Sequence, residues 1–104
     1  RPNVLMFGDW QVNCARIDAG QERLMAWEQG LPPDVRLVVV EVGAGTAVPS
    51  IRNLAERTAA EYAKSVLVRI NLDQSEVPPS LGPRGIAVGG LGALDALSQI
   101  DALI

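Results

Sequence analysis

Histidine is absent from this chain of 104 residues, and cysteine occurs only once, as Cys14. Histidine is the side chain that titrates nearest neutrality without help, so neither a Ser–His nor a Cys–His nucleophile pair can form within the chain. A zinc site that needs histidine or a cysteine cluster is excluded as well, and one cysteine cannot make an internal disulfide. We therefore name no catalytic residue and no metal ligand in this chain.

Long apolar runs and basic clusters are also missing. No run approaches the ~18 residues that a transmembrane helix needs, and the first residues, Arg-Pro-Asn, do not resemble a signal peptide. The net charge is −3, and no basic stripe offers a footprint for nucleic acid. We therefore expect a cytoplasmic protein that binds neither nucleic acid nor a membrane.

The hydrophobic share is high for so small a chain, at 48%. An apolar run already begins at Val4, whereas a whole protein usually begins with several residues that lie outside its ordered elements. We expect one partial domain over residues 1–104 that has been cut from something longer. Such a piece would self-associate, or it would lack the N-terminal half that covers its apolar surface and open sheet edge.

The first half of the chain predicts a strand, a helix and a second strand. Residues 4–7 are a short apolar run closed by Gly-Asp, which is typical of a strand. Aliphatic residues recur every seven positions over residues 16–29, which predicts an amphipathic helix. Residues 35–42 are nearly continuous, valine-rich and too short for a buried helix, so they predict a central strand of a parallel sheet.

The second half continues the alternation. After a glycine turn we expect a helix with Thr46 as its N-cap and Pro49 in its first turn. The apolar stripe of this helix is predicted to be Ile51, Leu54, Ala55, Thr58 and Tyr62. The remaining elements are a strand at 66–70, a loop at 73–85, a strand at 86–88 and a terminal helix marked by Leu91, Leu94, Leu97, Ile100 and Ile104. This order predicts an α/β fold, a parallel sheet flanked by helices with right-handed crossovers.

The turn that follows the valine-rich strand is the first candidate site. A strand that runs into a glycine turn and then a helix directs backbone N–H groups at one point, and the helix dipole favours phosphate or ribose oxygens there. The turn consists of Gly43, Ala44, Gly45 and Thr46. It matches neither the dinucleotide fingerprint nor the P-loop, so a plain turn that needs glycine is the alternative.

Two further segments carry polar residues at strand ends. Asn71 and Asp73 follow the strand at 66–70, and ligands of open parallel sheets lie beyond that edge. An Asx turn that closes the strand is the alternative. Residues 7–10, Phe-Gly-Asp-Trp, could pair with a peptide by strand addition, or they could end a strand with Trp10 in the core.

Glu41 lies inside the valine-rich strand, where a buried carboxylate needs a partner. Arg69 on the next strand could face it across the sheet, so we expect a structural ion pair. A general base beside the site is the alternative. Cys14 is interpreted as a small buried hydrophobe, and Trp27 as a core residue on a helix face.

Three of these segments, in the same order, resemble the C-terminal part of the NAD-binding domain of the sirtuins, the NAD-dependent protein deacylases. Residues 1–9, Arg-Pro-Asn-Val-Leu-Met-Phe-Gly-Asp, are similar to the sirtuin segment Arg-Pro-Asp-Val-Val-x-Phe-Gly-Glu. Residues 37–43 with Pro49 resemble the strand and Gly-Thr-Ser turn at the adenosine end of NAD, and residues 68–72 resemble the strand Val-Ile-x-Asn-Leu. The implied fold is a partial Rossmann-like unit.

The resemblance also implies roles for matched residues. NAD would be the cofactor, held on its adenosine side by Gly43, Ala44, Gly45, Thr46, Asn71, Asp73, Gly89 and Gly90, with the ribose hydroxyls at Asn71. An acyl-lysine protein or peptide would pair with the segment that contains Leu5, Phe7, Gly8 and Asp9. In the intact parent, the acyl oxygen would attack the ribose of NAD and release nicotinamide.

The chain departs from the sirtuin pattern in several places. The spacing from Gly43 to Pro49 is one residue shorter, Asp9 replaces the usual Glu, and Glu41 is unusual in its strand. The first glycine-rich loop, the catalytic histidine and the zinc cysteines have no counterpart here. We therefore expect this chain alone to be inactive as a deacylase. The alternatives are a non-catalytic nucleotide-binding module and a protein-interaction α/β module.

Overall fold

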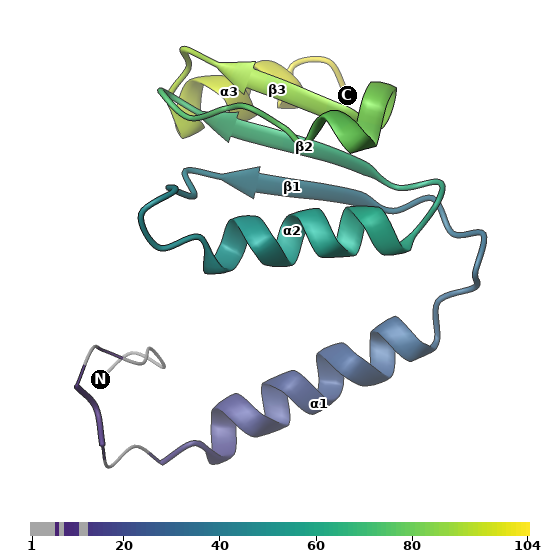
Figure 1. Cartoon of the computed structure of the whole chain (residues 1–104), viewed down its shortest axis with the longest axis vertical. Helices are drawn as coiled ribbons and strands as arrows, with labels where there is room; N and C mark the ends of the chain where they lie inside the picture. Colours follow the sequence, from purple (N-terminus) through teal and green to yellow (C-terminus); the bar gives the residue numbers. More distant parts are fainter. Residues whose placement is uncertain (1–5, 7, 11–12) are drawn as a thin grey trace. The chain divides into compact units, whose positions relative to one another are not determined.

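A computed structural model describes Met6, residues 8–10 and residues 13–104 of the chain. It divides into two compact units, residues 1–32 and residues 33–104, and each is described here by itself (Figure 1). Of the predicted strand at 4–7 only Met6 is described, and it is not assigned to a strand; Leu5 and Phe7 lie outside the described residues.

The described residues of the first unit include a tight turn and a helix. The N–H of Asp9 donates to the Met6 carbonyl at 3.1 Å, and the N–H of Met6 donates to Oδ2 of Asp9 at 2.8 Å. Gly8 sits in this turn with a φ of 83°, where a side chain would be strained. Helix α1 spans Ala15–Gln29, which confirms the prediction for residues 16–29.

No side chain of α1 is buried, although the whole helix is described. Trp27 is 52% exposed, so the prediction that it is a core residue is wrong. Trp10 is 93% exposed and Cys14 is exposed, so neither takes the buried position that composition suggested. Among the described residues every buried apolar side chain lies in the second unit, so the described part of the N-terminal segment contributes none to a core.

The second unit contains a parallel sheet of three strands in the order β1-β2-β3 (Figure 1). The strands are β1, Val38–Val42; β2, Val66–Asn71; and β3, Gly85–Gly89. The predicted α/β fold, with a parallel sheet flanked by helices, is confirmed. Strand β1 begins three residues later than predicted. The register places Glu41 opposite Arg69 and Asn71 opposite Gly89.

Helix α2 spans Ser50–Glu61 and covers one face of the sheet. Its alanines Ala55 and Ala59 pack with Leu67 of β2 and with Leu81, and Val39 and Val77 pack against this cluster. The predicted stripe is right at Ala55, which is buried, and wrong at Ile51 and Leu54, which are 58% and 44% exposed. The buried face is Arg52, Ala55 and Ala59 instead, since small alanines let the helix approach the sheet closely and leave room for a guanidinium at its start.

The start of α2 also differs from the prediction. The helix begins at Ser50 and Pro49 is its N-cap, so Thr46 does not cap it. The N–H of Asn53 donates to the Pro49 carbonyl at 2.8 Å, and within the described residues no side chain caps the first turn. Residues 43–49 are therefore an open loop rather than part of the helix.

The connection from β2 to β3 is more ordered than the predicted loop. It contains a 3₁₀ helix, η1, over Pro79–Arg84, which supplies Leu81 to the same face as α2. Successive parallel strands with crossovers of one hand place their connections on one face, as observed here. Each helix in the described part of the chain is too short or too polar to cross a bilayer.

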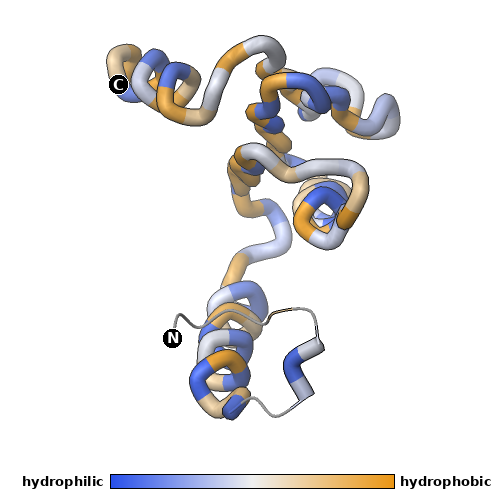
Figure 2. Tube along the Cα trace, turned by 90° about the vertical axis from the view of Figure 1, so that its left-hand side faces the viewer, coloured by the Kyte–Doolittle hydropathy of each residue, from blue (hydrophilic) through white to orange (hydrophobic). Residues whose placement is uncertain are grey.

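The opposite face of the sheet is only partly covered. Helix α3 spans Ala93–Asp101 and lies on the other side of the sheet from α2, with Ala96 buried (Figure 2). Ile70 of β2 is buried on that face. Val38, Val40 and Val42 of β1 are 61%, 51% and 40% exposed. A row of valines at the β1 edge therefore remains open to solvent.

Candidate functional site

The candidate site lies at the carboxyl ends of the three strands. Because the strands are parallel, the loops after β1, β2 and β3 all leave the sheet at this edge. The first of them begins at Gly43, whose N–H donates to the Ile70 carbonyl at 2.9 Å and continues the ladder for one residue. Its φ of 70° requires glycine, although the space around a Cβ there is empty.

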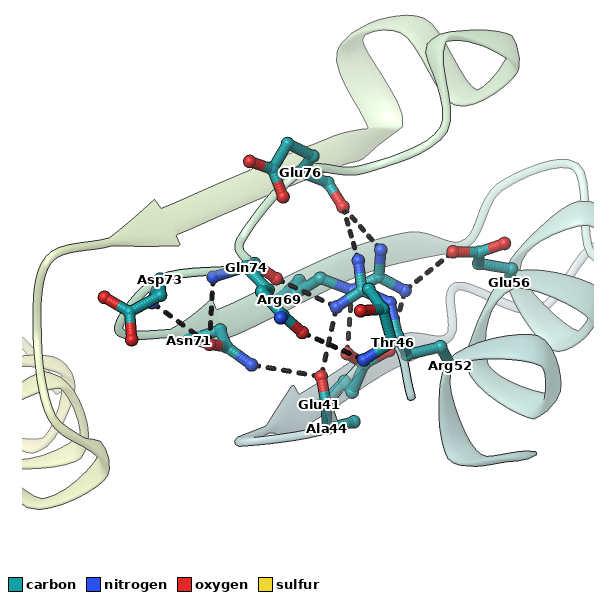
Figure 3. A network of polar contacts seen from close by, with 10 residues as sticks. All are labelled: Glu41, Ala44, Thr46, Arg52, Glu56, Arg69, Asn71, Asp73, Gln74 and Glu76. Carbon is teal, nitrogen blue, oxygen red and sulfur yellow. Dashed lines mark hydrogen bonds and ion pairs between the residues drawn. The ribbon is translucent and has the colours of Figure 1, made fainter. Parts of the chain in front are cut away.

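Asn71, the last residue of β2, joins the loops after β1 and β2 (Figure 3). Its Nδ2 donates to the Ala44 carbonyl at 3.0 Å. Its Oδ1 accepts from the N–H of Asp73 at 3.2 Å and from the N–H of Gln74 at 3.0 Å. The structure therefore contains the Asx turn of the alternative interpretation, and it shows in addition that the amide spans both loops.

Gln74 makes a second connection between the loops. Its Oε1 accepts from the N–H of Thr46 at 2.9 Å, across 28 residues of sequence. It also lies 3.7 Å from the position that a Cβ on Gly45 would take. A side-chain oxygen thus binds one of the backbone donors that the sequence analysis predicted for a ligand.

Arg52, in the first turn of α2, makes the third connection. Its Nη1 donates to the Ala44 carbonyl at 3.0 Å and to the Gln74 carbonyl at 2.8 Å, and its Nη2 donates to the Glu76 carbonyl at 3.2 Å (Figure 3). The side chain is buried, with the residue 8% exposed. Since the Ala44 carbonyl points inward to Arg52 and Asn71, the N–H on the other side of that trans peptide, at Gly45, points away from them.

A buried ion pair lies beside these loops. Nε and Nη2 of Arg69 donate to the two carboxylate oxygens of Glu41 at 2.7 and 2.8 Å, and both side chains are 1% exposed. This confirms the predicted structural pair, and a general base is not what the carboxylate provides, because both of its oxygens are bound. Arg69 Nη2 also donates to Glu56 Oε1 at 2.8 Å, and Nη1 donates to the Glu76 carbonyl.

The charge state of Arg69 is fixed by its surroundings. Desolvation by burial lowers the pKa of Arg69. The hydrogen bonds and the negative charges of Glu41 and Glu56 together outweigh that effect, so its pKa is raised above the ordinary value. With Arg52 the cluster contains two guanidinium groups and two carboxylates, so its formal charges balance beneath the loops.

The remaining predicted cofactor residues lie at the same edge. Gly89 ends β3, and a Cβ on it would come within 2.6 Å of Ser75 Oγ, so a larger residue there would force the Ser75 side chain to move. Gly90 has a φ of 73° and donates its N–H to the Leu72 carbonyl at 3.1 Å. The Asp73 carboxylate is exposed and directed away from the arginines (Figure 3).

The structure thus brings the eight predicted cofactor residues to one edge of one unit. The residues predicted to bind a peptide are different, since Gly8 and Asp9 belong to the first unit and Leu5 and Phe7 lie outside the described residues. Sequence reasoning missed Arg52, Gln74 and Glu56. The available signal for Arg52 was its spacing, because it lies three residues before Ala55 and seven before Ala59. It therefore shares the helix face whose other side chains are small alanines.

Among the described residues no three histidine, cysteine, aspartate or glutamate side chains cluster in a way that could hold a metal ion. Comparison with protein-family models, with curated proteins and with solved structures gave no match to this chain.

Proposed function

We propose that the carboxyl edge of the sheet binds the ribose–phosphate portion of an adenine nucleotide, as the adenosine side of an NAD site. The observation that supports this most directly is the convergence of the loops after β1 and β2. Asn71, Gln74 and Arg52 tie these loops together, so the turn at 43–46 is preformed next to the uncapped first turn of α2. Backbone donors and the helix dipole favour an anionic oxygen at that place.

The chemistry of the turn agrees with this proposal. The Gly45 N–H points away from the side chains that hold Ala44, and residues 45–50 are exposed. The described carboxylates of the cluster, Glu41 and Glu56, are bound to Arg69 rather than directed at the turn. Neither therefore competes with a phosphate for the same donors.

The sirtuin resemblance extends the proposal to an acyl-lysine deacylase. The chain would contribute the adenosine side of the NAD site and part of the peptide groove. The reaction would need a histidine base, and histidine is absent from this sequence. The purified chain is therefore expected to bind nucleotide without deacylating an acyl-lysine peptide. Robust NAD-dependent deacylation by the chain would contradict this assignment.

Titration with ADP-ribose tests the proposal directly. We expect amide chemical-shift changes in the loops at 43–46 and 71–74 when ADP-ribose or NAD is added, and smaller changes with adenosine, which lacks the phosphates. The absence of any shift with millimolar ADP-ribose would refute nucleotide binding at this edge.

Gly45 offers a matched pair of variants. It is exposed, its φ is ordinary for an L residue, and a Cβ would meet only Gln74 Oε1 at 3.7 Å. Gly45→Gln and Gly45→Glu place side chains of equal size at the turn and differ only in charge. One unit charge about 4 Å from a phosphate costs about 1 kcal/mol in water, so Gly45→Glu should bind ADP-ribose about fivefold more weakly than Gly45→Gln. Equal affinities would mean that the anion binds elsewhere.

A non-catalytic nucleotide-binding module is the second candidate. The Glu41–Arg69–Glu56 cluster favours it, because Arg69 binds both carboxylates and these ion pairs lie beside the loops as structural contacts. Supplying the chain with a sirtuin catalytic half in trans separates the two candidates. Restored deacylation would support the deacylase, and nucleotide binding without it would support the module.

A further inference from the structure

We infer that Arg52 is the positioning residue of the proposed nucleotide site, holding the loop after β1 and the loop after β2 at a fixed separation. This inference rests on the proposed function only for its ligand, because the loops and their connections exist in the free chain. Arg52 would not contact the nucleotide. It would act through the backbone of the two loops that do.

The geometry of the guanidinium supports this role. One planar group reaches three carbonyls, of Ala44 in the first loop and of Gln74 and Glu76 in the second, at 2.8 to 3.2 Å. A guanidinium presents its donors in a rigid fork, so binding at both nitrogens fixes the distance and the orientation between the acceptors. Lysine has a single ammonium group and cannot reproduce this span.

The surroundings of Arg52 are unfavourable for a positive charge. It is 8% exposed and lies in the first turn of α2, where the helix dipole disfavours a cation. The ion pairs that the structure describes give it no carboxylate partner, since Arg69 binds both Glu41 and Glu56. Three loop carbonyls compensate its charge instead, so the buried guanidinium and the positions of the two loops depend on each other.

Arg84 provides a matched control of the same design. Its Nη1 lies within hydrogen-bond distance of the carbonyls of Ala59, Tyr62 and Ser65, so it joins the end of α2 to the start of β2. It is partly buried and also binds mainly backbone oxygens. It sits at the amino ends of the strands, however, roughly 15 Å along the sheet from the candidate site.

The experiment compares Arg52→Met, Arg52→Lys and Arg84→Met in the full chain. We expect Arg52→Met to lower ADP-ribose affinity at least tenfold and Arg52→Lys to recover part of it, because a single ammonium group can still donate to the nearer carbonyls. Arg84→Met should destabilise the fold to a similar extent yet leave the affinity within about twofold of the starting chain.

Amide hydrogen exchange makes the inference testable without a ligand. The N–H of Thr46 is hydrogen-bonded to Gln74 across the two loops, and the N–H of Gln74 is bonded to Asn71 within the loop after β2. Arg52→Met should speed the exchange of both amides, whereas Arg84→Met should not do so selectively. If the unmodified chain binds no nucleotide, the proposed function is wrong. The exchange rates then still test whether Arg52 holds the two loops in position. Unchanged exchange at both amides in Arg52→Met, or equal affinity losses in the Arg52 and Arg84 variants, would overturn it. If Arg52→Met does not fold, Arg52→Lys serves for both readouts.

Discussion

Removal of the Arg69 guanidinium from the buried pair should be one of the most damaging single changes in the second unit. Arg69→Met leaves the Glu41 carboxylate, whose side chain is 1% exposed, without its two hydrogen bonds. Breaking a buried pair in this way costs about 3–5 kcal/mol. The Glu76 carbonyl also loses a donor, which adds about 1 kcal/mol. Glu56 contributes less, because its side chain is 34% exposed and can turn to water.

The double variant Glu41→Leu with Arg69→Met should recover most of this loss. Apolar replacement of a buried ion pair is often neutral or stabilising, because both desolvation penalties disappear. We expect the double variant to remain within about 2 kcal/mol of the starting chain, because the Glu76 carbonyl loses the hydrogen bond from Arg69 and keeps the one from Arg52. The coupling between the two substitutions would then be several kcal/mol, far above the value for independent sites.

Urea unfolding followed by far-ultraviolet circular dichroism measures these free energies. A unit of the size of residues 33–104 has about 4–11 kcal/mol of stability, so Arg69→Met can fall close to the unfolding threshold. If Arg69→Met does not fold, the comparison still holds, because a folded double variant shows that Glu41→Leu restores the stability lost in Arg69→Met. Additive effects of the two substitutions would refute the reasoning, since they would show that Glu41 does not depend on Arg69.

Four further outcomes follow from the same structure. Gln74→Ala should lower ADP-ribose affinity by roughly two- to tenfold, because it removes the hydrogen bond to the Thr46 N–H that helps to hold the turn at 43–46; tighter binding in calorimetry would show instead that Gln74 competes with the ligand for that N–H. Gly43→Ala should cost about 1–2 kcal/mol of stability through its φ of 70° alone, since no atom lies within 4 Å of the new Cβ; an unchanged urea midpoint would contradict this. The loss of unfolding free energy caused by Arg69→Met should be equal at pH 7 and pH 10. The pKa of Arg69 in the folded chain is raised above its ordinary value, so the charged guanidinium stabilises the fold at both pH values; a smaller loss at pH 10 would show that the guanidinium titrates. The chain should self-associate through β1, which pairs only with β2 among the described strands and exposes its valines, so Val40→Lys should favour the monomer in sedimentation velocity; a wild-type chain that stays monomeric at high concentration would sink this expectation.

Much of the second unit could be predicted from local sequence. Residues 38–42 and 66–71 are rich in β-branched side chains, and the glycine turn and proline-rich segment separate them from the helices, so pattern and turn chemistry agree. The pairing of Glu41 with Arg69 could be predicted as well, because a charged residue inside an apolar strand has few places to find a partner.

The faces of the helices could not be predicted in the same way. In α2 the aliphatic stripe through Ile51 and Leu54 is exposed, and the alanines face the sheet with Arg52. Periodicity identifies a row of apolar residues on a helix but does not show whether another element lies close enough to bury it. Close packing decides which face of α2 is buried, because only the alanine face allows the helix to approach the sheet while a guanidinium fills the remaining space.

The sequence by itself determined the order of strands and helices, the parallel sheet and the edge at which the polar loops meet, because these depend on local backbone preferences and on which residues are apolar. The tertiary structure alone decided how that edge is built. Arg52, Gln74 and Asn71 bind backbone groups of a loop that lies 8 to 28 residues away in the chain. Hydrogen bonds of that kind depend on the positions that the fold gives to both partners, so they cannot be predicted from a local sequence pattern.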